Sequence, residues 1–92
     1  MDEIKDRKAR HEISMAIDGL ARHPGAQGKA LLSPFEGVRS LKAVRGRYRI
    51  LYRLDEKERS VQVLLIGKRE PGQEGDVYAL ARKLLDALME EE

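Results

Sequence analysis

Three arginines stand at alternating positions of one short segment. Residues 46–54 read GRYRILYRL, in which Arg47, Arg49 and Arg53 alternate with apolar and aromatic residues. Successive side chains of a strand point to opposite faces of its sheet, so these three guanidinium groups would share one face. A guanidinium is a planar fork of donors that matches two phosphate oxygens at once. The pattern therefore indicates a surface that faces a polyanion such as RNA.

The charge of the chain is concentrated around this segment. The net charge of the 92 residues is only +2, but residues 39–69 hold ten basic and three acidic residues. Residues 70–92 hold two basic and seven acidic residues. A basic region followed by an acidic tail again favours a polyanion as partner. The candidate RNA contacts are Arg45, Arg47, Arg53 and Lys68.

The composition limits the class of protein. A chain of this length forms one domain at most, spanning residues 1–92. It has no cysteine, which excludes disulfides and thiolate metal sites, and His11 and His23 are not spaced as a metal pair. No apolar run approaches the roughly 20 residues that cross a bilayer, and the N-terminal residues lack the apolar core of a signal peptide. We expect a cytoplasmic protein with no membrane partner, no metal and no small-molecule cofactor.

The periodicity of apolar residues predicts a helix, strands and a second helix. Residues 2–22 carry apolar residues at spacings of three and four, and the same spacing returns after Asp76, a favoured N-cap residue. Three segments between them have the pattern of strands, and a charged connection of hairpin length joins the last two: 39–45, 47–54 and 61–66. This order predicts an α+β domain with an antiparallel sheet of three or four strands.

We expect this sheet to have one apolar face and one wet face. The apolar face of the second strand would pack against the helices and consists of Tyr48, Ile50, Tyr52 and Leu54. The arginine side, which also carries Leu51, would face solvent, because an antiparallel sheet can leave one face wet.

Two stretches of the chain resemble the RelE branch of the RelE/ParE toxins. The stretch SLKAVRGRYRILYRLDEKERSVQVLLIGKRE resembles the sheet of that family without a gap, and VY follows at the start of the last helix. The resemblance covers roughly residues 13–85, and residues 2–22 match only the second helix of the family's opening hairpin. It implies a toxin that cleaves messenger RNA in the ribosomal A site and inhibits translation. The implied partners are the ribosome, messenger RNA and a cognate antitoxin.

The resemblance also implies a metal-independent catalytic cluster, which consists of Lys42, Arg49, Arg69 and Tyr78. Cleavage of RNA through its own 2′-hydroxyl needs a base, positive charge for the phosphorane and an acid for the leaving oxygen. Arginine suits the second task, and lysine serves as a base when neighbouring cations favour its neutral form. Tyr78 can stack on a base or transfer a proton, although packing against the sheet is its alternative role.

Two features depart from the family pattern and keep other functions open. Ser40 stands where the family often has a second lysine, and the turn between Arg69 and Tyr78 is longer than usual. One alternative is a weakened toxin that only binds RNA or the ribosome. Another is a non-catalytic ParE-like toxin that inhibits a topoisomerase. A sheet-based RNA-binding module is less favoured, because the sequence lacks an exposed aromatic platform.

Overall fold

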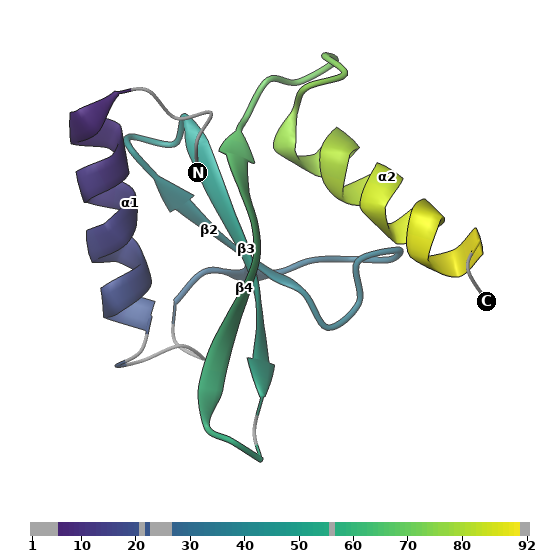
Figure 1. Cartoon of the computed structure of the whole chain (residues 1–92), viewed down its shortest axis with the longest axis horizontal. Helices are drawn as coiled ribbons and strands as arrows, with labels where there is room; N and C mark the ends of the chain where they lie inside the picture. Colours follow the sequence, from purple (N-terminus) through teal and green to yellow (C-terminus); the bar gives the residue numbers. More distant parts are fainter. Residues whose placement is uncertain (1–5, 21, 23–26, 56, 91–92) are drawn as a thin grey trace.

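Two helices enclose one antiparallel sheet, with one helix against each face (Figure 1). The computed structural model describes residues 6–20, 22, 27–55 and 57–90, with side chains described as far as residue 87. The elements are α1 (Arg7–Leu20), β1 (Lys29–Ala30), β2 (Arg39–Ala43), β3 (Tyr48–Asp55), β4 (Ser60–Lys68) and α2 (Val77–Glu90). The strands follow one another in the order β1-β2-β3-β4. The prediction of an α+β domain with an N-terminal and a C-terminal helix is confirmed.

The N-terminal helix begins at a side-chain cap. The Asp6 carboxylate accepts hydrogen bonds from the backbone N–H groups of Lys8, at 2.9 Å, and Ala9, at 3.3 Å. These donors have no partner within the helix, so the cap stabilises its first turn. The apolar stripe of α1 then packs on the sheet face that carries Tyr48, Ile50 and Tyr52.

The strands differ most from the prediction at β1 and β2, while the bounds of β3 and β4 differ from the predicted ones by one or two residues. Residues 29 and 30 form a short strand where the sequence predicted only a loop, and Lys29 pairs with Ser40 of β2. The predicted strand 39–45 ends at Ala43, because Val44 and Arg45 have φ values of 54° and 58°. This left-handed conformation is incompatible with a strand and closes the turn to β3. Arg45 therefore lies in a turn, outside the sheet.

The expectation that both helices cover the same face is wrong. Leu51 is on the arginine side of β3, yet only 2% of its surface is exposed. Its strand neighbours Ser40 and Leu65 share that side, and the first turn of α2 reaches the same layer through Val77, which is fully buried. Gly67 allows this approach, since a Cβ there would lie 3.2 Å from the Cβ of Val77. The face that was expected to be wet is thus partly covered by α2.

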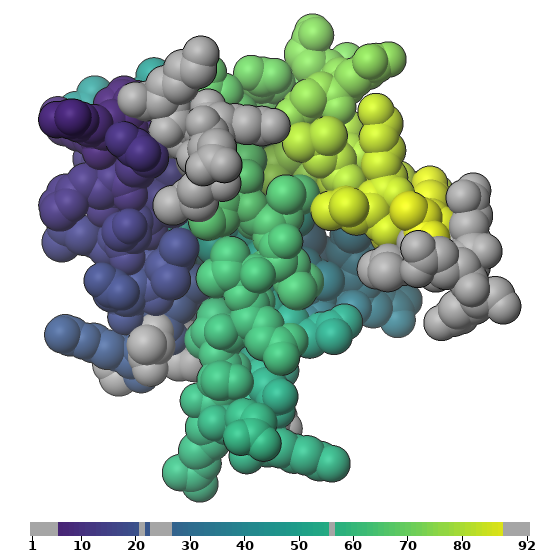
Figure 2. All heavy atoms as spheres, in the orientation of Figure 1, coloured from purple at the N-terminus to yellow at the C-terminus, as the bar shows by residue number. Residues whose placement is uncertain are grey.

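One part of the sheet stands away from both helices. The end of the β3–β4 hairpin projects from the body of the molecule (Figure 2). Asp55 closes this hairpin, because its carboxylate accepts hydrogen bonds from the backbone N–H groups of Lys57 and Glu58. Neither α1 nor α2 has the length and apolarity needed to cross a membrane, in the part of each that the structure describes.

Candidate functional site

A pocket of about 500 Å³ opens between the sheet and the start of α2. We call it the cationic pocket, because four of its lining residues are basic and none is acidic. Its lining consists of Gly28, Lys29, Leu31, Ser40, Leu41, Lys42, Arg49, Arg69 and Tyr78. The structure therefore brings together all four residues that the sequence predicted as catalytic. Their catalytic roles stay a prediction.

The strand register places the first two of these residues side by side. Lys42 of β2 is the direct cross-strand partner of Arg49 of β3. Residues opposite each other in an antiparallel pair have Cβ atoms about 5 Å apart and point to the same face. Two cations of the pocket lining are thus neighbours on one face of the sheet, although seven positions separate them in the sequence.

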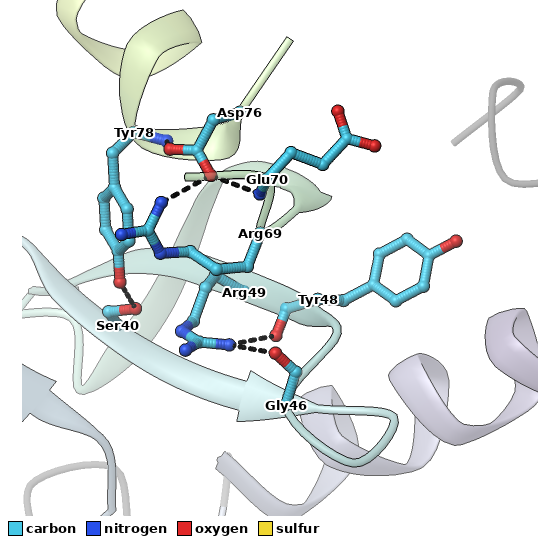
Figure 3. A network of polar contacts seen from close by, with 8 residues as sticks. All are labelled: Ser40, Gly46, Tyr48, Arg49, Arg69, Glu70, Asp76 and Tyr78. Carbon is cyan, nitrogen blue, oxygen red and sulfur yellow. Dashed lines mark hydrogen bonds and ion pairs between the residues drawn. The ribbon is translucent and has the colours of Figure 1, made fainter. Parts of the chain in front are cut away.

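The side chain of Arg49 is anchored by backbone carbonyls (Figure 3). Its Nη1 donates to the carbonyl oxygens of Gly46, at 2.5 Å, and Tyr48, at 3.3 Å. Gly46 belongs to the turn between β2 and β3, and Tyr48 is the first residue of β3. The left-handed residues of that turn therefore have a local role, since they direct a carbonyl group toward this arginine.

The side chain of Arg69 is anchored by an ion pair. Its backbone N–H extends the sheet by donating to the carbonyl of Arg47 at 2.7 Å. Its Nη1 lies 2.6 Å from Oδ1 of Asp76, and its Cζ lies 4.8 Å from the centre of the Tyr78 ring. The distance of 4.8 Å from Cζ to the ring centre is that of a cation–π contact. Arg69 is consequently held between the cap residue of α2 and the tyrosine of its first turn.

Asp76 links these groups, and the sequence predicted only part of its role. Its Oδ2 accepts from the backbone N–H of Tyr78 at 3.0 Å, which confirms the predicted N-cap. Its Oδ1 accepts from Arg69 and from the backbone N–H of Glu70. Burial raises the pKa of this carboxyl, but the hydrogen bond from Arg69, the two backbone donors and the charge of Arg69 outweigh burial and lower the pKa below its ordinary value. Asp76 is therefore ionised at neutral pH and balances the charge of Arg69.

Ser40 has a defined contact in the pocket. Its hydroxyl lies 2.8 Å from the hydroxyl of Tyr78, and the serine is 7% exposed. Ser40 therefore holds the far end of the tyrosine side chain. Tyr78 is fixed at both ends, at its backbone by Asp76 and at its hydroxyl by Ser40 (Figure 3).

We expect Ser40→Ala and Tyr78→Phe each to lower the free energy of unfolding by about 1 kcal/mol, because each leaves one half-buried or buried hydroxyl without its partner. Urea denaturation of both variants and of the double variant measures the effect. The double variant should cost no more than either single variant, since neither hydroxyl is then left unpartnered. Strictly additive losses would show that the two hydroxyls do not interact.

The predicted RNA contacts lie outside the cationic pocket. Lys68 is opposite Tyr48 in the register, so its side chain belongs to the face that packs against α1. The four residues are exposed and none lines the pocket: Arg45, Arg47, Arg53 and Lys68. Lys29 is the basic pocket residue that sequence reasoning missed, and its two-residue strand has no periodicity that could have located it.

No group of three metal-binding side chains exists among the described residues. Of the two histidines, His11 is exposed on α1 and His23 lies outside the described residues. Comparisons with protein-family models, with curated proteins and with solved structures found no match.

Proposed function

We propose that this protein is a RelE-like toxin that cleaves messenger RNA in the ribosomal A site. The observation that carries the proposal is the convergence of Lys42, Arg49, Arg69 and Tyr78 on one pocket. These residues come from two strands, the segment after β4 and the first turn of α2. Residues so far apart in sequence meet only because the fold has this register and this placement of α2.

The pocket supplies the groups that RNA cleavage through the 2′-hydroxyl needs. The 2′-oxygen forms a bond to phosphorus and the bond to the 5′-oxygen breaks, which leaves a cyclic phosphate and a 5′-hydroxyl. Arg49 and Arg69 stabilise the charge on the phosphorane, and each is held in place by contacts that exist before substrate arrives. Lys42 accepts the proton of the 2′-hydroxyl. The leaving 5′-oxygen takes its proton from Tyr78 or, where Tyr78 stacks on the neighbouring base instead, from water.

Cleavage should depend on the ribosome. The pocket has few acid–base groups for a nuclease that acts alone, because no histidine is among its lining residues. A ribosome that holds the message in the cleavable geometry would supply the missing orientation, which is worth several kcal/mol. The test adds purified protein to a stalled ribosome complex with a defined codon in the A site and maps breaks in the message by primer extension.

We expect breaks in the A-site codon within the ribosome complex and none in the same message without ribosomes. Equal cutting of the naked message would contradict ribosome dependence. Absence of cutting in both samples would contradict an enzymatic function. The same proposal includes a cognate antitoxin with an acidic segment that covers the cationic pocket, and its addition should suppress the breaks.

One observation favours a second candidate, a weakened toxin that binds the ribosome or RNA without cutting. Arg69 is ion-paired with Asp76, and the Tyr78 hydroxyl is bonded to Ser40. Arg49 is also engaged, by the backbone carbonyls of Gly46 and Tyr48, so three of the four groups already have partners within the protein. Protection of A-site nucleotides in a footprint, with an intact message, would identify this candidate.

A further inference from the structure

Asp76 binds two residues that line the cationic pocket, Arg69 and Tyr78. We propose that Asp76 is a positioning residue, whose single carboxylate directs the Arg69 guanidinium and places the Tyr78 ring for a phosphodiester bound in the pocket. The inference rests on the proposed function for its effect on cleavage, but its structural part can be tested alone.

Each oxygen of the carboxylate has a separate task (Figure 3). Oδ1 accepts from Nη1 of Arg69 at 2.6 Å and from the backbone N–H of Glu70, and Oδ2 accepts from the backbone N–H of Tyr78 at 3.0 Å. Asp76 is 4% exposed, so its carboxylate is removed from water, while the Arg69 side chain is 32% exposed and reaches the pocket. The arrangement ties the end of β4 to the first turn of α2 across an exposed turn, residues 71–75.

The ion pair leaves Arg69 able to bind a ligand. A guanidinium has five N–H donors in a fixed plane, and the bond to Asp76 uses Nη1. Within the described residues, Nε and Nη2 of Arg69 donate to no protein group, and the residue lines the pocket. An arginine side chain that is free to rotate loses rotamer entropy when it binds a phosphate. Asp76 removes part of that cost in advance, because it already fixes the plane of the fork.

A suitable variant must separate positioning from helix capping. Asparagine and serine are as favourable as aspartate at an N-cap, so Asp76→Asn and Asp76→Ser keep an acceptor for the N–H of Tyr78. Neither has two anionic oxygens, so neither can also hold Arg69 by an ion pair. Asp86→Asn is the matched control, since it removes the same charge from within the helix that Asp76 caps. Asp86 is exposed and pairs only with Arg82, at 3.6 Å, among the contacts of the described residues.

The structural test follows the arginine Nε–Hε groups by ¹⁵N NMR in the full chain. In the unaltered protein and in Asp86→Asn, we expect an ordered Arg69 signal. In Asp76→Asn and Asp76→Ser, that signal should become mobile, while the Arg49 signal and the amide protection inside α2 stay unchanged. An Arg69 signal that stays ordered would overturn the proposal. Loss of α2 protection in both variants would also overturn it, because Asp76 would then act only as a helix cap.

The functional test measures single-turnover cleavage in the ribosome complex. Asp76→Asn should lower the maximal rate constant on the order of 10-fold to 100-fold, with little change in the half-saturating concentration, and Asp86→Asn should leave both unchanged. In the Arg69→Ala background, Asp76→Asn should have no further effect, because this variant keeps the acceptor for the N–H of Tyr78 and loses only the ion pair with Arg69. Unchanged cleavage by Asp76→Asn would contradict positioning while the proposed function stands. If the unaltered protein does not cleave, the proposed function fails, and the NMR result still decides whether Asp76 orders Arg69.

Discussion

Arg69→Ala and Arg49→Ala are each expected to lower the rate of message cleavage about 100-fold or more, the scale for removal of a transition-state donor. Both side chains line the cationic pocket and both are anchored, Arg69 by Asp76 and Arg49 by backbone carbonyls. An anchored cation stabilises charge that develops in the reaction without a cost of reorganisation. Single-turnover cleavage of a defined A-site codon, at saturating protein, measures the loss.

Arg53→Ala is the control for these two variants. Arg53 belongs to the same strand but is exposed on the projecting hairpin and does not line the pocket. Its removal should weaken binding in a salt-dependent way, with about one fewer ion released, and leave the rate at saturation unchanged. If all three variants change only the affinity, and by similar factors, the arginines form a binding patch and the catalytic roles are wrong.

Leu51→Ala is expected to lower the free energy of unfolding by about 2–5 kcal/mol, the range for a buried leucine that leaves a cavity. Leu51 is 2% exposed and lies on the face that α2 covers. Ile50 and Tyr52 lie on the opposite face, which packs against α1. The midpoint and slope of urea denaturation measure the loss. A loss of this size from the arginine side of β3 would mean that the sheet is buried on both faces at this point.

Leu64→Ala is the matched control, because it is the same substitution on the adjacent strand. Leu64 is 46% exposed and lies at the irregularity where the β3–β4 register shifts. Its removal should cost less than about 1 kcal/mol, as for a surface position. Equal losses for the two variants would contradict the covering of this face by α2.

The sequence predicted the elements of the fold better than their packing. Apolar spacing reports which residues share a face, so the helices and the three longer strands could be located. It does not report which element covers that face. Leu51, an apolar residue on a side otherwise occupied by arginines, was the one local signal that this side would be partly buried. The strand β1 could not be predicted, since two residues are too few to show a period.

The sequence predicted which residues form the candidate site, but not the contacts among them. Resemblance to a known pattern selected Lys42, Arg49, Arg69 and Tyr78, and the fold brings them to one pocket. The bond between Ser40 and Tyr78 joins residues 38 positions apart and depends on where α2 docks. The cap pattern predicted one acceptor role for Asp76. Its second role depends on the path of the glycine- and proline-containing turn before it, for which the sequence has no periodicity.

The residues that line the pocket are spread over much of the sequence, so the pocket can form only late in synthesis of the chain. Its lining runs from Gly28 to Tyr78, and Asp76 and Tyr78 are among the last residues that complete it. A nascent chain that ends before α2 carries the basic strands but cannot close the pocket over them. Translation must therefore pass the codon for Tyr78 before any copy of the protein presents the assembled site, and every product that terminates earlier lacks it.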